Sequence, residues 1–384
     1  MGSHIDIQVV SNPRSHADFI DMPWRVNQND ADWAPPLRMA VKKLLDTKKY
    51  PFFNHGEAAF FMAYKHGEPA GRIAAIDNKL HAKTYNDGVG FFGFFECEDD
   101  EQVCKALLSR AATWVKDRGY NRVRGPLNYS VNDENPGVLF EGFNGPPLIL
   151  MSHNPAYYNR LLQQCGMGKA KDLYAYMVTR ATFASDRFQR VMKAVRRRAP
   201  KLDLREARLD GKGFREDIET MLRIFNGAWN ENWGFVEVTP PEVDAIAEDL
   251  KPIVDPKITA IAEFEGKPVG MIVCVPNVNE ILLNIPDGKL FPTGWYKLLT
   301  GLRNIKGFRT MLMGVIPEYR GRGVDALMID KVMQDGDAAG YNYCELSWVL
   351  EDNEPMTSLA DKAGGVLYRK YRIYEADTDA LILP

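Results

Sequence analysis

Residues 310–324 read Thr-Met-Leu-Met-Gly-Val-Ile-Pro-Glu-Tyr-Arg-Gly-Arg-Gly-Val, and this stretch decides the fold. The apolar run predicts a buried strand that ends before Pro317. Arg320-Gly321-Arg322-Gly323 follows and leads into a helix that begins near Val324. A strand, a glycine-rich turn and a helix N-terminus predict an anion site, because the unpaired N–H groups and the helix dipole both favour negative charge.

Two other glycine motifs do not fit this loop. The dinucleotide fingerprint needs a glycine at the sixth position from Gly321, where Ala326 stands. The P-loop needs Gly-Lys-Ser/Thr after the turn, and that sequence does not follow. An ordinary turn with two surface arginines is the alternative to an anion site.

The two halves of the chain repeat each other. A constant shift of 199 residues relates Gly67, Pro69, Gly71 and Ile73 to Gly266, Pro268, Gly270 and Ile272. A shift of 221 relates Gly119-Tyr120-Asn121 to Gly340-Tyr341-Asn342, and the shift returns to 199 at the pairs Asn154/Asn353 and Gly166/Gly365. The change in shift places an extra segment between Ile272 and Gly314 and another between Asn121 and Asn154. The repeat predicts a duplicated unit.

Each copy has the pattern of a hairpin, a strand, a long helix (near 101–118 or 323–339) and further strands. We therefore predict an α/β (α+β) fold with two tandem units, each a mixed, mostly antiparallel sheet flanked by helices. The predicted units are residues 5–183 and 201–384, and residues 184–200 are a helical connector.

Residues 315–324 resemble motif A of the GNAT acyltransferases, whose core is Arg/Gln-x-x-Gly-x-Gly/Ala. The strand Glu345-Leu346-Ser347-Trp348-Val349 and the segment from Asn353 to Leu359 resemble the family's following elements. The arrangement of the whole chain is similar to that of long bacterial two-unit GNAT-like proteins of the ceramide synthase type, which acylate a sphingoid amine.

The resemblance implies an acyl-CoA co-substrate whose pyrophosphate lies on the loop and whose pantetheine lies along the preceding strand. The implied contacts are Val315, Ile316, Arg320, Gly321, Arg322, Gly323, Val324 and Asn353. Two residues depart from the family pattern. Asp325 stands where the family has Gly or Ala, and Ala360 stands where many members have the Tyr that protonates the thiolate.

The N-terminal copy lacks the loop. Asp99-Asp100-Glu101-Gln102 occupies the position of Arg320 to Gly323, and acidic side chains repel a pyrophosphate. We therefore expect one co-substrate site in the chain.

The chemistry implied by the family is attack of an amine on a thioester, which requires carbonyl polarisation and proton removal. We assign the polarising contact to the N–H of Val315. Glu345 is the candidate base, with the alternative that it is a carboxylate satisfied by neighbours. Tyr368 is a candidate acid, as is Tyr371.

We expect the acceptor to bind near polar segments that turn-forming residues interrupt too often for them to form a core. Asn128 and Asn132 lie in one of them, and Trp229, Asn230 and Trp233 end a predicted helix. A packed helix end is the alternative for the tryptophan segment. The apolar runs Phe91–Phe95 and Leu290–Leu302 are candidates for an acyl tunnel or for core.

Composition narrows the partners. A net charge of -3 gives no basic footprint for nucleic acid. The triplet Arg196-Arg197-Arg198 is predicted to be a solvated helix face, with a site for phosphate or an anionic membrane surface as the alternative. Five scattered cysteines and six unclustered histidines predict a reducing cytoplasm and no metal. The longest apolar runs are shorter than the roughly 20 residues that span a bilayer, which leaves peripheral contact with the inner membrane face open.

We predict an N-acyltransferase that uses acyl-CoA and a small-molecule or lipid amine. Three alternatives differ in class: an acetyltransferase for a small polar amine, an aminoacyl transferase fed by tRNA, and a non-catalytic acyl-CoA-binding protein. The intact loop and the acidic charge balance argue against the tRNA-dependent enzyme.

Overall fold

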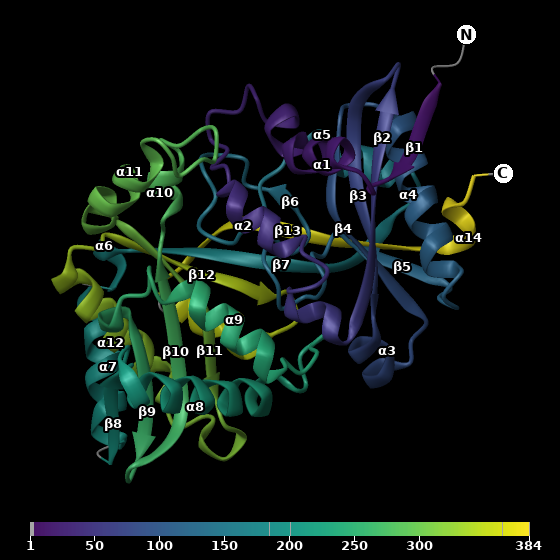
Figure 1. Cartoon of the computed structure of the whole chain (residues 1–384). Helices are drawn as coiled ribbons and strands as arrows, with labels where there is room; N and C mark the ends of the chain where they lie inside the picture. The colour runs from purple at the N-terminus through teal and green to yellow at the C-terminus, as the bar shows by residue number, and fades with distance from the viewer. Residues whose placement is uncertain (1–3, 184, 200, 363, 384) are drawn as a thin grey trace. The chain divides into compact units, whose positions relative to one another are not determined.

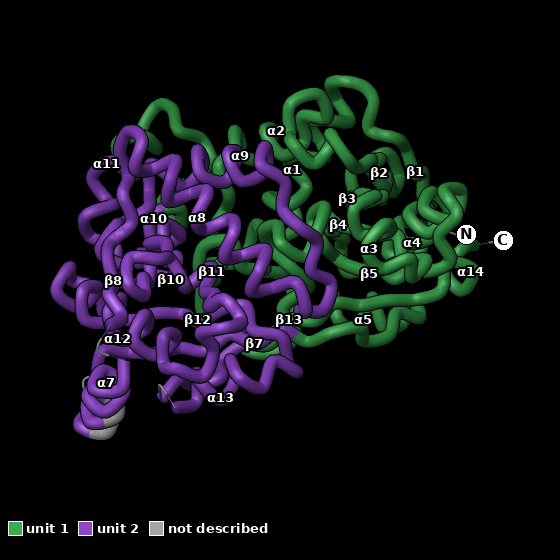
Figure 2. Tube along the Cα trace, turned by 90° about the horizontal axis from the view of Figure 1, so that it is seen from below, with its two compact units in different colours: residues 1–172, 282–298, 370–384 green, residues 173–281, 299–369 purple. Residues whose placement is uncertain are grey.

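The structure is a computed structural model that describes residues 4–183, 185–199, 201–362 and 364–383. Most of its helices and strands are labelled in Figure 1. They form two compact units (Figure 2): unit 1 takes in residues 1–172, 282–298 and 370–384, and unit 2 takes in residues 173–281 and 299–369. Helices cover a mostly antiparallel sheet in each unit, which confirms the predicted fold class.

The sheet of unit 1 has the strand order β1-β2-β3-β4-β5-β13, and β6 also pairs with β13. Among the described pairings of this unit, β4 with β5 is the parallel one. The elements are β1 (Ile5–Val9), α1 (Pro13–Val26), α2 (Arg38–Leu44), β2 (Gly56–Lys65), β3 (Glu68–Asn78), α3 (Lys79–Tyr85), β4 (Val89–Cys97), α4 (Glu101–Lys116), β5 (Arg122–Gly125), β6 (Val138–Glu141), α5 (Tyr157–Gln164) and α14 (Thr378–Leu381).

Strand β3 is covered on both faces. Ile73 belongs to the core that α4 closes, and a Cβ on Gly71 would lie 2.7 Å from Leu107 of that helix. Arg72 is one residue out of phase and faces α1, where its guanidinium donates to the carbonyl of Phe19 at 2.7 Å. The alternation follows from the two-residue period of a strand.

The sheet of unit 2 has the order β7-β12-β11-β10-β9-β8, with β11 and β12 as the parallel pair among those described. Its elements are α6 (Arg180–Phe183), α7 (Asp186–Arg198), β8 (Leu202–Glu206), α8 (Gly211–Trp229), α9 (Pro240–Leu250), β9 (Thr259–Phe264), β10 (Lys267–Pro276), β11 (Gly307–Val315), α12 (Val324–Ala339), β12 (Tyr343–Leu350) and α13 (Glu354–Lys362).

Helices also cover both faces of this sheet. Met271 and Val273 of β10 pack with Ile224 of α8 in one core cluster. Gly270 faces the other side, where a Cβ would lie 3.1 Å from Val324 of α12. The first residue of helix α12 therefore packs against β10, the strand that pairs with β11 just before the predicted loop.

The predicted duplication is confirmed. Hairpin β2–β3 corresponds to β9–β10, and their turn glycines, Gly67 and Gly266, have φ of 82° and 77°. The long helices α4 and α12 correspond in the same way. Each is followed by a left-handed glycine, Gly119 with φ 91° and Gly340 with φ 98°, which ends a helix without steric cost.

The two compact units do not coincide with the two halves of the sequence, because each half contributes part of one strand to the other unit. Strand β7 (Gly168–Thr179) ends the N-terminal half, yet its residues from Leu173 onward belong to unit 2 and pair with β12. Strand β13 (Val366–Asp377) ends the C-terminal half, yet from Lys370 onward it belongs to unit 1 and pairs with β5. Helix α7 lies in the predicted connector, of which residues 184 and 200 fall outside the described residues.

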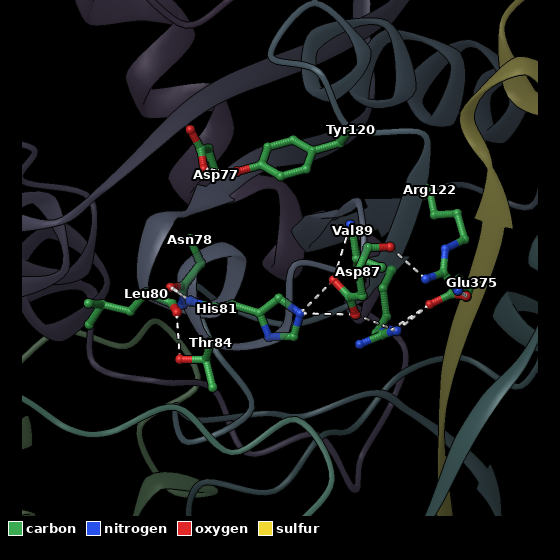
Figure 3. A network of polar contacts seen from close by, with 11 residues as sticks. Asp77, Asn78, Leu80, His81, Thr84, Asp87, Val89, Tyr120, Arg122 and Glu375 are labelled. Atoms are coloured by element: carbon green, nitrogen blue, oxygen red, sulfur yellow. Dashed lines mark hydrogen bonds and ion pairs between the residues drawn. The ribbon is translucent and has the colours of Figure 1, made fainter.

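A buried ionic network joins α3 to the sheet of unit 1 (Figure 3). The ring of His81 is 2% exposed, and its Nε2 lies 3.3 Å from both carboxylate oxygens of Asp87. Arg124 pairs with Asp87 at 3.6 Å and with Glu375 at 2.6 Å, and Arg122 donates to the other oxygen of Glu375 at 2.8 Å. Burial lowers the pKa of the His81 imidazole, and the Asp87 carboxylate opposes that shift only in part.

This depressed pKa predicts acid sensitivity. The unfolded chain takes up a proton at His81 more readily than the folded one, so the contribution to stability is complete above the unfolded pKa of about 6.5 and declines as pH falls below it. We expect the slope of unfolding free energy between pH 7.5 and 5.5 to become smaller in His81→Gln, by at most about 1.4 kcal/mol per pH unit. Urea unfolding at several pH values measures this, and an unchanged slope would show that another group is responsible.

Candidate functional site

Strands β11 and β12 begin as a parallel pair and then separate. Their pairing runs from Gly307 with Tyr343 to Thr310 with Leu346, although β11 continues to Val315. On its other side β12 pairs with β7 both before and after a register shift that follows Leu346. Among the described residues, therefore, no strand pairs with the second half of β11 on the β12 side.

A cavity of about 480 Å³ lies where the two strands diverge. All of its lining residues belong to unit 2, and most of their side chains are apolar. They come from the end of α8, from β11 and the loop after it, from α12, from β12 and from α13: Ala228, Trp229, Glu231, Asn232, Thr310, Met311, Met313, Gly314, Val315, Tyr319, Arg320, Gly321, Asp325, Ile329, Leu346, Ser347, Trp348, Val349, Leu350, Asn353, Pro355, Met356, Leu359 and Ala360.

The open edge of β11 presents backbone groups to this cavity. Ile316 N–H donates to the carbonyl of Val269 at 3.0 Å, so the alternation of an antiparallel ladder turns Val315 and Met313 away from β10. The indole of Trp229 confirms the direction, because it donates to the carbonyl of Met313 at 3.0 Å. The N–H groups of Met313 and Val315 consequently face the side from which β12 has departed.

Two left-handed glycines form the turn between β11 and α12. Gly321 has φ 72° and Gly323, the residue before the helix, has φ 80°. No side chain caps this helix end at Gly323. A Cβ on Gly321 would meet no atom within 4 Å, whereas one on Gly323 would lie 2.3 Å from a methyl group of Val195 on α7. Gly321 is therefore the open part of the loop, and Gly323 is packed against α7.

The charged residues of the loop make mainly internal contacts. Arg320 donates to the carbonyl of Ala228 at 2.8 Å and so secures the end of α8. Asp325 accepts the N–H of Ala326 at 2.8 Å and takes one of the free amides of the helix. Arg322 is exposed. The remaining amides and the helix dipole supply the electropositive character of this end of the cavity.

A buried polar network lies beside the cavity. Glu345 is 0% exposed and accepts hydrogen bonds from Ser347 and Tyr368. Arg309, its partner across the parallel pair, lies 3.9 Å from the Glu345 carboxylate and donates to Ser347 Oγ at 2.8 Å. Ser347 lines the cavity, but the other three residues do not.

The predicted site residues divide between the cavity and its surroundings. Those that line it are Trp229, Val315, Arg320, Gly321 and Asn353. Asn353 also caps α13 through its side-chain oxygen, which accepts Met356 N–H at 3.2 Å. The predicted residues that do not line it are Asn128, Asn132, Asn230, Trp233, Ile316, Arg322, Gly323, Val324, Glu345 and Tyr368.

The apolar runs proposed for an acyl tunnel are absent from this lining. Phe92 is fully buried in the core of unit 1, and Phe291 is 74% exposed. The tunnel assignment is therefore wrong for this cavity, since one run fills a core and the other faces solvent. Sequence reasoning also missed Arg309 and Trp348. Arg309 had a signal: it is a cation within an apolar strand, at the position that a parallel register places beside Glu345.

In unit 1 the corresponding positions are filled by the protein itself. Leu127 N–H donates to the carbonyl of Phe92 at 2.8 Å, and the side-chain oxygen of Asn128 accepts Phe94 N–H at 2.7 Å, so the chain after β5 closes the edge of β4. Asp100 accepts two amides at the start of α4, those of Gln102 at 2.8 Å and of Val103 at 3.3 Å. These contacts use the groups that are open in unit 2.

A split parallel strand pair, a glycine turn and an uncapped helix N-terminus define the GNAT class of acyltransferase. Comparison with known proteins agrees, and the chain belongs to the GNAT family. Residues 218–365 match the family model described as Acetyltransferase (GNAT) family.

Two relatives match nearly the whole chain. The bacterial ceramide synthase of Caulobacter vibrioides (strain NA1000 / CB15N) is 37% identical over 374 residues, which is 95% of this chain and 96% of that protein. Protein YghO of Escherichia coli (strain K12) is 33% identical over 365 residues, covering 93% and 91%. Together with the family match, they show that the chain is an N-acyltransferase.

Solved structures match the fold at low sequence identity. A tandem GNAT protein from the clavulanic acid biosynthesis pathway has a TM-score of 0.57 at 10% identity and covers 98% of this chain and 99% of its own. A GCN5-related N-acetyltransferase from Sphaerobacter thermophilus has a TM-score of 0.53 at 12% identity, with 97% and 96% covered. Both matches extend over the two halves, which supports the tandem arrangement. Within the described residues, no helix combines the length and apolar character needed to cross a bilayer.

Proposed function

We propose that the cavity of unit 2 binds an acyl-CoA and that the chain transfers the acyl group to a primary amine. The observation that carries the proposal is the separation of β11 from β12, which exposes strand amides beside a helix N-terminus. An extended chain can pair with such an edge as an added strand would, and a diphosphate fits the helix end. Acyl-CoA is the co-substrate that GNAT proteins use, and it combines both parts.

The residues present fit this co-substrate. The backbone around Gly321 is open to a phosphate, and the open edge of β11 suits an extended pantetheine. Bound acyl-CoA would supply the activated carbonyl as a thioester. Ala360 lies at the cavity wall, where many GNAT enzymes carry a tyrosine, so the proton for the thiolate comes from another source.

A long acyl chain is the version of this activity that we favour. Methionine side chains at Met311, Met313 and Met356 and the aliphatic groups of Leu350 and Leu359 form an apolar and adaptable wall. The relative from Caulobacter is named a ceramide synthase, so its acceptor class, a sphingoid amine, is our first candidate.

The polar network provides a route for the amine proton. Ser347 Oγ accepts from Arg309 and donates to Glu345, and a hydroxyl oxygen has a second lone pair for a substrate N–H. We assign proton acceptance to Glu345 acting through Ser347, because the carboxylate itself does not reach the cavity. Tyr368 holds the second carboxylate oxygen of Glu345 and so acts as a positioning residue. The N–H of Val315 polarises the carbonyl.

The loop assignment predicts a selective loss of affinity. Gly321→Val adds a side chain to the open part of the loop, and we expect calorimetry to show coenzyme A binding weakened roughly tenfold or more. Gly340→Val is a matched control, since Gly340 is also left-handed and open but lies at the far end of α12. Both changes carry about 1–2 kcal/mol of backbone strain. Equal coenzyme A affinity in the two variants would refute the loop assignment.

The catalytic assignment predicts distinct kinetic effects. Val315→Pro removes one N–H on an open strand edge, and we expect kcat to fall by about 10²–10³ while coenzyme A still binds. Ser347→Ala should lower kcat by about 10²–10⁴ through loss of the relay. Val315→Ala keeps the amide and is the control for Val315→Pro. A Val315→Pro enzyme with normal kcat would exclude the backbone contact.

The activity itself is tested by thiol release from acyl-CoAs of increasing chain length, from acetyl to palmitoyl, with a sphingoid base or a small polyamine as acceptor. We expect release with long acyl chains and the sphingoid base. Release with acetyl-CoA and the polyamine alone would make this a small-amine acetyltransferase instead. Absence of coenzyme A binding by calorimetry would remove the proposal altogether.

A further inference from the structure

The segment from Lys289 to Lys297 displays large aromatic side chains to solvent. Phe291 is 74% exposed, Tyr296 is 59% exposed and Trp295 is 47% exposed. The rings of Trp295 and Tyr296 meet edge to face with centroids 6.0 Å apart. Large apolar side chains that cluster on an exposed surface commonly mark a site of contact with another protein or a membrane.

The backbone beneath these rings is well fixed. Trp295 N–H donates to the carbonyl of Leu290 at 2.8 Å, and its indole N–H donates to the carbonyl of Pro292 at 2.9 Å. Gly294 is buried, and a Cβ there would lie 2.2 Å from the carbonyl oxygen of Lys289. The aromatic rings therefore project from an ordered turn, and their polar N–H groups are satisfied within the segment.

Helices α1 and α2 of the same unit hold the segment in place. The indole of Trp24 donates to the carbonyl of Pro286 at 2.9 Å. Arg38 donates through its side chain to the carbonyl of Asp287 at 2.8 Å and through its backbone to that of Gly288 at 2.9 Å. The aromatic rings are therefore exposed on a segment whose backbone start is held by hydrogen bonds.

The charge of this stretch differs from that of the whole chain. Residues 289–306 contain the basic residues Lys289, Lys297, Arg303 and Lys306 and no acidic residue, whereas the chain has a net charge of -3. Lys289 and Lys297 flank the three rings in sequence and are exposed. The Lys297 ammonium also donates to the carbonyl of Asn284 at 2.6 Å.

We propose that Phe291, Trp295 and Tyr296, with Lys289 and Lys297, dock the protein on the surface of an anionic lipid bilayer. Tryptophan and tyrosine prefer the headgroup region, and lysines are attracted to anionic lipids. A second copy of this chain is a poorer occupant, because a two-fold interface sets each patch against itself and opposes like charges. The proposal concerns a surface outside the acyl-CoA cavity and does not depend on the proposed reaction.

Co-sedimentation of the full chain with vesicles, without any substrate, tests the proposal. We expect binding to vesicles with about 30 mol% phosphatidylglycerol to exceed binding to pure phosphatidylcholine and to weaken with added salt. The triple change Phe291→Ser, Trp295→Ser and Tyr296→Ser should lower binding at least tenfold. Lys289→Glu should lower binding to the anionic vesicles about fivefold or more. Val9→Ser with Leu383→Ser is the control, because these side chains are 48% and 51% exposed outside the segment.

Three results would overturn the proposal. The first is wild-type protein that binds neither kind of vesicle. The second is a triple variant that keeps its circular dichroism spectrum and still binds like the wild type. The third is a concentration-dependent dimer that the triple variant abolishes while vesicle binding is unchanged, which would assign the rings to self-association.

Discussion

Two parallel strands stop pairing after Thr310 and Leu346, and along the next part of β11 no strand in the described part of the chain receives the outward amides. A strand edge inside a protein normally needs a partner, because an unpaired and buried N–H group costs free energy. Here side chains donate hydrogen bonds to the outward carbonyls: Trp229 donates to the carbonyl of Met313, and Arg320 donates to that of Val315. The amides of Met313 and Val315 are the groups that we propose for acyl-CoA. The apolar cavity, the glycine turn and the buried polar network of Glu345 and Ser347 all lie at that edge.

Unit 1 shows how the same framework becomes closed. Its parallel pair also separates, but Asn128 bonds the β4 edge and Asp100 caps the helix that corresponds to α12. An amide oxygen and a carboxylate thus occupy positions equivalent to those proposed for the carbonyl and the phosphate of acyl-CoA. Closing a duplicated site with two side chains stabilises the fold of one unit without requiring any change in the arrangement of strands.

The sequence predicted the elements with strong local signals. Glycines at fixed spacing gave the hairpin turns and the ends of the two long helices, because only glycine adopts those backbone angles freely. The duplication and the fold class followed from them. The glycine loop likewise located Gly321 and Val315, which the structure places at the cavity.

The rest of the site depends on contacts that no local pattern encodes. Glu345 was a candidate base from its strand position alone, and the sequence does not reveal that Ser347, which donates to it, lines the cavity in its place. The bond between Trp229 and Met313 joins residues 84 positions apart in the chain. The exchange of β7 and β13 was equally hidden, because strand patterns specify which face is apolar but not which edge is taken.

That exchange also bears on how the protein is made. Strand β13 belongs to the C-terminal half, yet from Lys370 onward it lies in the sheet of unit 1, while β7 of the N-terminal half lies in that of unit 2 from Leu173 onward. During translation β5 therefore lacks its neighbour until residues 374–377 have been made. If the gene were cut at the connector, each fragment would contain a sheet with an unpaired edge strand, and such edges promote aggregation. The two copies are thus linked by more than the connector, because each half of the chain supplies a strand to the sheet of the other unit.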